Sequence, residues 1–391
     1  MDYTRAPLAF RARKAARYVQ LYGPRRTFVK VRGQYHMREA GPAVGRPMAP
    51  AREDAHVGLI GCGNFAFSHI AYFVERNVGR VMRGAMDIEG ARAESIARSY
   101  RMHYATDDAR RIIDDPKIDL VYVASNHATH ADYAIEALQA GKNVHIEKPH
   151  VVDDDQLARL CKAMRESTGS VRLGFNRPES RLGLEVQRML AAQSGPVMLN
   201  WFVAGHAIAP DHWYYRPEEG GRVLGNLCHW TDFTLRMIDP AARYPITVTP
   251  TRATQPDSDI AVSYVFGDGS IAVITFSAKG HAFEGVREHL ELHRGDLLLS
   301  LDDFKEVRAH ARERRSRTRL RYRDHGQEAA ILRSYAMSGR TAETERGVDV
   351  EYVWDTAQLF LRTREALEAE RGRVVSPFRE ADLERKPLHA G

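Results

Sequence analysis

Residues 57–66 constrain the fold of this 391-residue chain more than any other stretch. A short apolar run breaks there into Gly61-x-Gly63-x-x-Ala66 and continues as a helical pattern. The first glycine permits a tight turn, the second lets phosphates approach the backbone, and the small third residue lets a helix pack close to the strand. Backbone N–H groups and the helix dipole then attract the anion. The pattern predicts that a dinucleotide binds at Gly61, Gly63, Asn64, Phe65 and Ala66.

Strand and helix patterns alternate from residue 55 to residue 172, which predicts a doubly wound parallel sheet of the Rossmann type. The strand expected over 81–86 ends at Asp87, roughly 20–26 residues beyond the glycines, where a carboxylate accepts hydrogen bonds from the adenosine ribose. Asp87 favours NAD over NADP because its charge repels a 2′-phosphate and no cation directly follows it.

Two polar motifs follow later strands of this sheet. The turn at 125–130 opens a helix, and Glu147-Lys148-Pro149 follows the strand expected over 143–146. With the glycine turn and Asp87, these motifs resemble the Gfo/Idh/MocA (glucose-fructose oxidoreductase / inositol dehydrogenase) family, over residues 57–377. The resemblance implies an NAD-dependent dehydrogenase whose cofactor contacts include Ser125, Asn126, His127, His130, Glu147, Lys148 and Asn176.

The resemblance also gives Lys148 a catalytic role. In the family, the lysine that matches Lys148 hydrogen-bonds the reacting hydroxyl and helps to position the nicotinamide. A partly buried ammonium group near a cofactor can have a lowered pKa and take part in acid–base chemistry. A cis peptide bond before Pro149 would aim this lysine inward.

The second half, residues 173–391, is predicted to be an α+β domain with an open, largely antiparallel sheet. Strand patterns recur between turns such as Gly267-Asp268-Gly269, and a long amphipathic helix is expected over 349–370. Because relatives often dimerise through this sheet, the resemblance implies a homo-oligomer. The strands are expected over 197–203, 247–251, 260–266, 270–277 and 289–294.

Residues 211–232 resemble the catalytic stretch of the family, a glycine-rich turn that leads into a helix with an Asp-x-x-x-His pair. His229 matches the histidine, which implies an acid–base role for it. The aspartate position is Gly225, and Asn226 occupies the acidic position of the subgroup that the chain most resembles. Residues expected to hold the substrate are Lys148, Arg177, Trp213, Tyr215, Arg216, Arg222, Asn226 and His229.

The first 54 residues form a basic N-terminal extension and linker that the resemblance does not cover. Apolar residues recur at helical spacing over 8–22 against a basic face, and Gly23-Pro24 is expected to stop that helix. A strand is expected over 27–35 and a linker over 40–50. Three roles are open for this amphipathic helix: it covers its own protein or a second subunit, it lies on a membrane surface, or it belongs to a transit peptide. The first role is preferred.

The formal net charge is +6, and its excess lies in the first fifty residues, including Arg46, and in the run 308–323. We interpret the second run as a solvated face, because aromatic residues are not interleaved with it as a nucleic-acid platform requires. Cys62, Cys161 and Cys228 are too widely spaced to suggest a disulfide framework or a metal site. No membrane span or signal peptide is indicated, so a cytoplasmic protein is expected.

The leading hypothesis is an NAD-dependent oxidoreductase that acts on a secondary hydroxyl or ketone of a sugar, such as a nucleotide sugar in surface polysaccharide assembly. An inositol or cyclitol dehydrogenase is the alternative within enzymes. A non-catalytic NAD-binding sensor or scaffold is a different alternative, which Gly225 keeps open.

Overall fold

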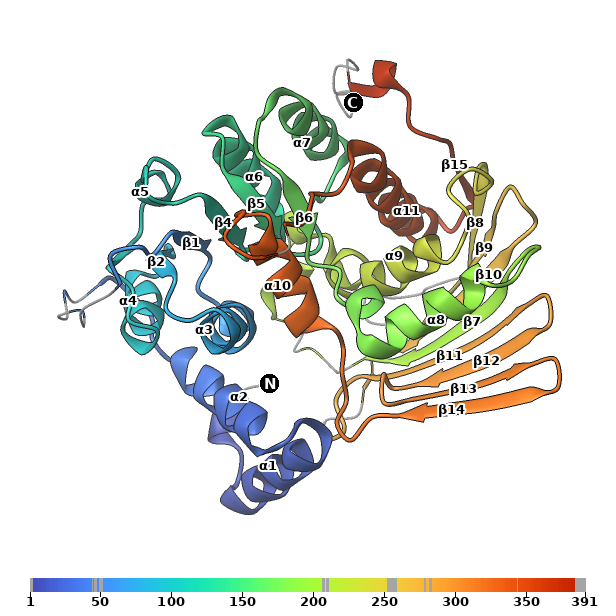
Figure 1. The fold of residues 1–391 in the computed structure, drawn as a ribbon, viewed down its shortest axis with the longest axis horizontal. Helices are drawn as coiled ribbons and strands as arrows, with labels where there is room; N and C mark the ends of the chain where they lie inside the picture. The colour runs from blue at the N-terminus through green and yellow to red at the C-terminus, as the bar shows by residue number, and fades with distance from the viewer. Residues whose placement is uncertain are drawn as a thin grey trace.

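A computed structural model of the chain describes residues 3–43, 45, 48, 52–205, 208, 211–251, 259–277, 279–280, 283–342 and 344–383. Figure 1 shows two sheets beside one another and, at one end of the molecule, a pair of N-terminal helices. Arg46 and much of the expected linker lie outside the described residues. The division of the chain at residues 54 and 172 remains a proposal.

The first sheet confirms the predicted doubly wound architecture. Its six strands are parallel and run in the order β3-β2-β1-β4-β5-β6. The order reverses between β1 and β4, and ligands of open parallel sheets bind outside the carboxyl ends of the strands at such a point. The strands are β1 (Val57–Ile60), β2 (Met82–Met86), β3 (Tyr104–Thr106), β4 (Leu120–Val123), β5 (Asn143–Ile146) and β6 (Val171–Leu173).

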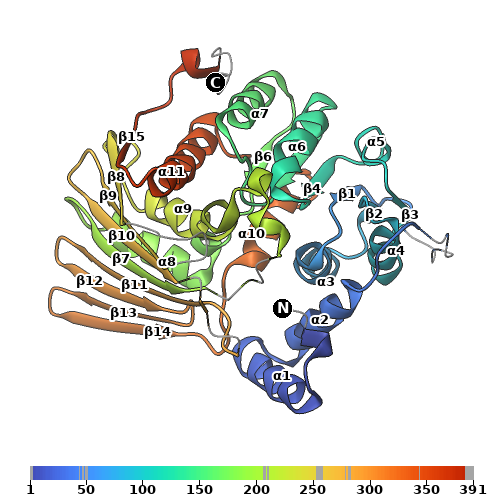
Figure 2. The same cartoon turned by 180° about the vertical axis from the view of Figure 1, so that it is seen from behind.

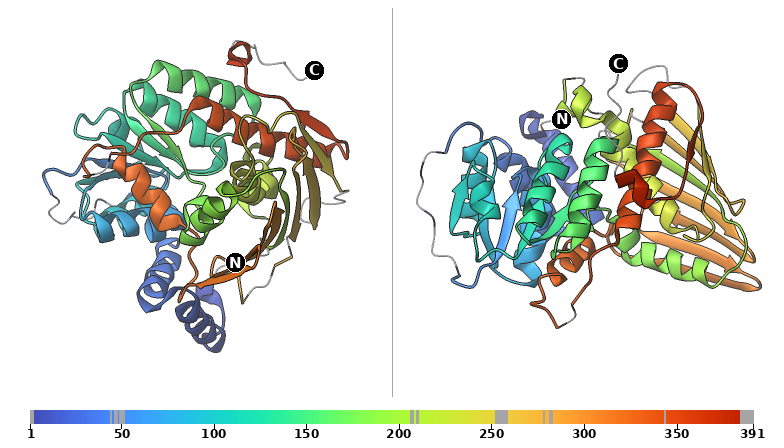
Figure 3. Two further views of the ribbon diagram at one scale, coloured as in Figure 1. Left: turned by 45° about the vertical axis from the view of Figure 1, so that its right-hand side comes forward. Right: turned by 90° about the horizontal axis from the view of Figure 1, so that it is seen from above.

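The second sheet has nine strands and is largely antiparallel, as expected, with β7 and β10 as its parallel pair. Alternate residues of β7 are buried and exposed, so one face of the sheet packs on helices and the other faces outward (Figure 3). The strands are β7 (Met198–Ala204), β8 (Ile246–Pro250), β9 (Ile260–Val265), β10 (Ile271–Ser277), β11 (Arg287–Arg294), β12 (Leu297–Asp302), β13 (Glu306–Ala311), β14 (Arg314–Arg319) and β15 (Arg373–Val375).

Two apolar cores cover the two faces of the first sheet, and a third fills the space between the second sheet and its helices. The long helix α11 joins two of these cores, because Phe360 packs against the first sheet's helices and Leu359 against the second sheet. The helices that follow the N-terminal extension are α3 (Tyr72–Asn77), α4 (Gly90–Ser99), α5 (Arg110–Ile113), α6 (His130–Gln139), α7 (Asp154–Glu166), α8 (Arg181–Ala191), α9 (Cys228–Arg236), α10 (Gln327–Ala336) and α11 (Val350–Glu368). The short helical turns are η1 (Tyr3–Arg5), η2 (Ala66–Ala71), η3 (His127–Thr129), η4 (Arg177–Glu179), η5 (Trp213–Tyr215), η6 (Pro217–Glu219), η7 (Val223–Leu227) and η8 (Glu380–Leu383).

The N-terminal extension forms a helical hairpin, α1 (Leu8–Tyr22) and α2 (Pro24–His36). The prediction of a helix over 8–22 is confirmed, whereas the strand expected over 27–35 is wrong. Pro24 occupies the first turn of α2, where its missing N–H costs nothing, and Val29, Gly33 and His36 are buried at helical spacing. Figure 2 shows α2 beside α3 and α4, with α1 toward the second sheet.

The basic run at 308–323 lies largely on β13 and β14, where β14 is an edge strand whose residues are mostly exposed. Glu306 pairs with Arg308 and Arg317 at 2.5 and 2.8 Å, and charged side chains on an edge strand discourage pairing with another sheet. Within the described parts of the chain, no helix is both long and apolar enough to cross a bilayer.

Candidate active site

The glycine turn after β1 lies against the turn after β4, and this contact explains its first glycine. Gly61 has a φ of +89°, and a Cβ added to it would lie 2.4 Å from the Ser125 backbone nitrogen. Gly63 is different, because among the described residues, its own chain neighbours aside, no atom lies within 4 Å of the position its Cβ would take. Ala66 is fully buried at the start of η2, a π-helical turn. The backbone at Ser125 thus fills the space beside Gly61, whereas the space beside Gly63 is open to a phosphate.

Asp87 connects the end of β2 to this turn. Its carboxylate accepts hydrogen bonds from the Cys62 N–H at 2.7 Å and the Glu89 N–H at 2.9 Å. The Arg92 guanidinium, from α4, approaches the same carboxylate at 3.9 Å. Asp87 therefore fixes the turn, and its contact with the ribose remains a prediction. Arg92 places a cation near Asp87 although no cation follows Asp87 directly in the sequence.

The turn at 125–130 brings two predicted histidines into the interior. The His130 ring nitrogens lie 2.7 Å from the Pro149 carbonyl and 3.0 Å from the Ser125 carbonyl. Burial lowers the pKa of His130, so its neutral ring donates to one of these two carbonyls. His127 donates from Nδ1 to the Glu219 carbonyl at 2.9 Å. The turn is thereby fastened both to the end of β5 and to η6.

The Glu147-Lys148-Pro149 motif lies at the end of β5, and its Lys148–Pro149 peptide bond is cis, as expected. Glu147 is buried and contacts His145 Nε2 at 3.1 Å. The Lys148 ammonium donates a hydrogen bond to the Gly225 carbonyl at 2.6 Å. This hydrogen bond joins the end of the first sheet to the turn that leads to His229.

His229 lies in the first turn of α9, after the π-helical turn η7. Its ring is buried, and its Nδ1 has no hydrogen-bond partner among the described residues. Burial, together with the charges of Arg177 and Lys148, lowers the pKa of His229 well below its usual range. The imidazole is therefore neutral at pH 7 and able to accept a proton.

Gly225 marks the departure from the family pattern, and the structure shows what occupies the space. A Cβ added to Gly225 would lie 2.7 Å from His127 Cε1 and 2.7 Å from Tyr214 Cε2. Two aromatic rings thus fill the space where an aspartate side chain would begin. Asn226 follows, and its Oδ1 is buried without a hydrogen-bond partner among the described residues.

Arg177 and Asn176 lie together at the start of the second half. Arg177 forms a two-pronged ion pair with Glu288, at 3.1 and 3.0 Å, and its guanidinium lies over the Trp230 ring. Trp230 donates from its indole nitrogen to the same carboxylate at 2.9 Å. The Asn176 side-chain oxygen accepts from Arg177 at 3.1 Å. Arg177 is therefore held by the protein, although it stays beside His229.

The remaining predicted substrate residues come from 213–222. Trp213 packs edge-on against His127 with ring centres 4.6 Å apart, which brings this segment to the turn after β4. Tyr215 is half-buried, and Arg216 is exposed. Arg222 is buried and lies over the Phe276 ring at 5.1 Å. These residues surround the glycine-rich turn, but their contact with a substrate remains a prediction.

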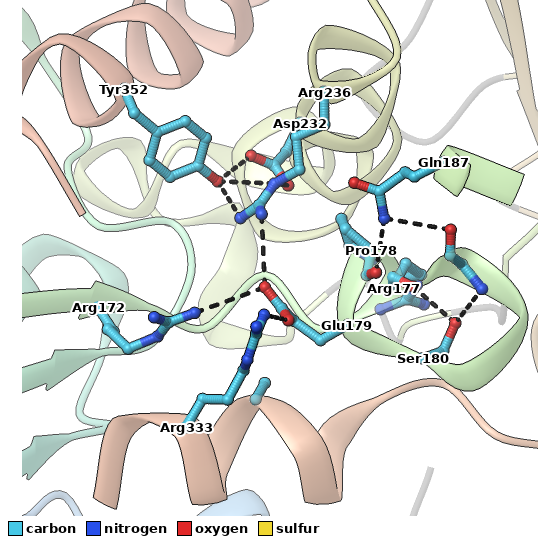
Figure 4. Close-up of polar contacts among 12 residues, drawn as sticks. Arg172, Arg177, Pro178, Glu179, Ser180, Gln187, Asp232, Arg236, Arg333 and Tyr352 are labelled. Carbon is cyan, nitrogen blue, oxygen red and sulfur yellow. Dashed lines mark hydrogen bonds and ion pairs between the residues drawn. The ribbon is translucent and has the colours of Figure 1, made fainter. Parts of the chain in front are cut away.

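A network of ion pairs holds α9 in place (Figure 4). Asp232 and Arg236 of α9 pair at 3.2 Å, and the Tyr352 hydroxyl donates to Asp232 at 2.5 Å. Glu179 lies at its centre and pairs with Arg236 at 3.4 Å, with Arg172 of β6 at 3.6 Å and with Arg333 of α10. Four other elements (η4, β6, α10 and α11) thus converge on the helix that carries His229.

Sequence reasoning missed several titratable residues of this region, because they lie in segments with no recognised motif. Glu288 is the second residue of β11. His325 precedes α10, and its Nε2 lies 3.3 Å from the Glu288 carboxylate. His69 lies in η2, stacked on Phe65 at 4.5 Å. For His69 one sequence signal was available. It stands four residues, about one helical turn, after Phe65 of the glycine turn, so the two side chains share one face of the helix.

Residues 55–175 match the family described as "Oxidoreductase family, NAD-binding Rossmann fold". Two curated relatives are each 32% identical to the chain: the uncharacterized oxidoreductase YrbE of Bacillus subtilis, over 56% of this chain and 65% of its own length, and inositol 2-dehydrogenase 2 of Saccharopolyspora erythraea, over 34% and 40%. The chain thus spans less than two thirds of either relative.

Solved structures share the fold. A levoglucosan dehydrogenase in complex with NADH and L-sorbose superposes with a TM-score of 0.69 at 16% identity, covering 83% of this chain and 99% of that one. A putative myo-inositol dehydrogenase from Sinorhizobium meliloti 1021 gives 0.66 at 20% identity, covering 83% and 100%. The likeness includes both sheets, so it extends beyond the residues that the family comparison matches.

Proposed function

The chain belongs to the Gfo/Idh/MocA family of NAD-binding oxidoreductases, and on that basis we propose that it transfers a hydride between NAD and a secondary hydroxyl or ketone of a sugar or cyclitol. Bound NAD supplies the hydride acceptor. The names of the relatives, inositol and levoglucosan dehydrogenases, support a polyhydroxylated substrate. The narrower expectation of a nucleotide sugar finds no support in the comparisons.

The observation that carries the proposal is the neutral, buried His229 near the Lys148 ammonium. The His229 imidazole accepts the hydroxyl proton, and Lys148 donates a hydrogen bond to the same oxygen, which stabilises the alkoxide as it forms. The hydrogen bond from Lys148 to Gly225 keeps the two groups on adjacent turns. Orientation and exclusion of water then contribute most to catalysis.

The cofactor contacts follow the strand ends. We propose that Gly61, Gly63, Asn64, Phe65 and Ala66 hold the pyrophosphate and that Asp87 holds the adenosine ribose. The open space at Gly63 fits phosphate groups that approach the backbone. The 125–130 turn, Glu147, Lys148 and Asn176 would flank the nicotinamide half, because they follow β4, β5 and β6.

The test is the absorbance of reduced nicotinamide when the protein is mixed with NAD and a panel of inositols and free sugars. Lys148→Ala and His229→Ala should each reduce turnover by about 10²- to 10⁴-fold, while replacement of an exposed histidine on β11, His293→Ala, should not. If NADH binds and no member of the panel is turned over, the non-catalytic sensor becomes the better proposal.

We also propose that the protein is a cytoplasmic homo-oligomer that pairs through the outer face of the second sheet. The three cysteines are free and buried, which fits a reducing compartment. Large apolar side chains stand on two strands of that face that flank β11, with Met198 and Phe202 of β7 and Leu298 of β12 about 60% exposed. Light scattering of the wild type and of Phe202→Glu tests this assembly, because a charge at its centre should yield monomers.

A further inference from the structure

The N-terminal hairpin connects the two halves of the molecule. On the side of the first sheet, α2 packs on η2, where a Cβ added to Gly33 would lie 2.6 Å from Asn64 Oδ1, and His36 contacts the Cys62 carbonyl at 2.7 Å. On the other side, the Leu21 carbonyl accepts the Arg323 N–H at 2.8 Å, and Arg17 pairs with Glu284 at 2.7 Å. Side chains in the middle of α2 therefore lie between the nucleotide half and the substrate half.

Lys30 is the cation at this position. Its ammonium lies over the Tyr22 ring, 4.7 Å from the centroid, and the side chain is half-buried. Across the described residues, no carboxylate lies within ion-pair distance of it. Burial and the charges of Arg26 and Arg323 lower the pKa of Lys30 to about 7. A half-buried ammonium among cations is unfavourable until an anion approaches it.

The carboxylates nearby are already engaged. Asp303 pairs with Arg323, and Glu288 pairs with Arg177. Lys30 lies close enough to His325 to lower the pKa of that histidine, and His325 in turn lowers the pKa of His229. Lys30 and Arg323 both lie over the Tyr22 ring, 4.7 and 5.7 Å from its centroid, so Arg323 and, two residues further along the chain, His325 connect Lys30 to the region of the proposed base.

We propose that Lys30, with Arg323 and His325 beside it, forms a subsite for an oxyanion on the substrate, a carboxylate or a phosphate ester, at the end remote from the hydroxyl that His229 and Lys148 hold. The inference rests on the proposed function and narrows its substrate to acidic sugars or cyclitols. A helix outside the family match would then set substrate specificity.

The pyrophosphate of the cofactor is the competing anion, and the geometry separates the two. The glycine turn contacts α2 through Gly33 and His36, near the end of that helix, whereas Lys30 faces Tyr22 and the Arg323 segment. NADH affinity is therefore expected to be unchanged when Lys30 is replaced. A loss of NADH affinity in the Lys30 variant would reassign this cation to the cofactor and overturn the inference.

The experiment compares glucose, glucuronate and glucose 6-phosphate as substrates of the full chain and follows inorganic phosphate binding by calorimetry in the NAD-saturated protein. Lys30→Met should weaken kcat/KM for the acidic sugars, and phosphate affinity, by about 10- to 100-fold while leaving glucose unchanged. Lys30→Arg should retain the preference. Arg25→Met is the matched control, because it removes an exposed positive charge from the same helix.

The two readouts separate this inference from the proposed function. Phosphate binding that depends on Lys30, without turnover of any sugar, supports the subsite and contradicts the dehydrogenase. Turnover of sugars with no effect of Lys30→Met on either acidic sugars or phosphate supports the dehydrogenase and overturns the subsite. Thermal unfolding of each variant excludes loss of fold as the cause.

Discussion

The glycine-turn half of the site and the His229 half are built in different ways. At the glycine turn, both backbone polar groups of Cys62 have partners in the protein: its N–H donates to Asp87, and its carbonyl contacts His36. In the second, His229 Nδ1 and Asn226 Oδ1 are buried without a partner among the described residues. Because buried polar groups are rarely left unpaired, the contrast indicates a preformed cradle on one side and a surface completed by its ligand on the other.

The largest expected effect is acid destabilisation, which sharpens the contrast because most of the responsible histidines lie between the two halves. Burial lowers the folded-state pKa of five histidines most strongly, so below pH 6.5 the unfolded chain binds protons that the folded protein does not, and stability falls. At pH 5.5 each of the five reduces the free energy of unfolding by on the order of 1 kcal/mol, and together they remove several kcal/mol. The five are His69, His127, His150, His229 and His325.

Urea unfolding at pH 7.5 and pH 5.5 measures this loss. Asp303 offsets part of it, because burial raises its pKa to about 6 and the folded protein then gains a proton as the pH falls. His229→Gln should reduce the loss by about 1 kcal/mol, whereas replacement of the exposed His293 of β11 by Gln should not. An equal loss in all three proteins would contradict the assignment to buried histidines.

Glu288 is an exception within the second half, since its buried carboxylate has partners in Arg177 and Trp230. Glu288→Gln would leave the Arg177 guanidinium buried and uncompensated, and the expected loss in unfolding free energy is about 3–5 kcal/mol. Glu291→Gln, on the same strand and exposed, should cost less than about 0.5 kcal/mol. Similar losses in both variants would show that the Arg177 pair contributes no special stability.

The two glycines of the turn test the first half directly. Gly61→Ala places a methyl group against the Ser125 backbone at positive φ, so both stability and NADH affinity should fall, stability by about 3 kcal/mol. Gly63→Ala meets no protein atom, so stability should stay within about 0.5 kcal/mol of the wild type. NADH affinity should nevertheless fall by at least about tenfold, because the methyl group occupies the approach of the phosphates. Equal losses of stability would contradict this division of roles.

The first sheet and its strand-end motifs could be predicted from sequence because they depend on local rules. Short apolar strands, Gly61 at a tight turn and helices with clear ends each leave a pattern of a few residues. The strand expected over 27–35 failed for a tertiary reason: α2 buries Val29, Gly33 and His36 against η2, and apolar spacing in so short a segment fits either element.

The substrate half was less accessible to sequence reasoning. Strands β12 to β14 went unrecognised, and β14 is an exposed edge of charged residues with little apolar alternation. The pairing of Glu288 with Arg177 joins residues 111 positions apart, and no local pattern reports such a contact. Among the described residues, Lys30 has no carboxylate within ion-pair distance. This environment likewise depends on how the N-terminal hairpin docks between the two halves.

Gly225 gives the smallest expected effect and the sharpest test of the second half. If the space that the family's aspartate side chain occupies were empty in this protein, the Gly225→Asp side chain would fit there and raise turnover. The rings of His127 and Tyr214 already occupy the Cβ position, so the substitution must displace them, at a cost of about 1–3 kcal/mol in unfolding free energy. Gly225→Ala, which adds the Cβ alone, should share most of that cost. A gain in turnover from Gly225→Asp without loss of stability would show instead that this half accepts the aspartate, and that its proton transfer is limited by the missing carboxylate.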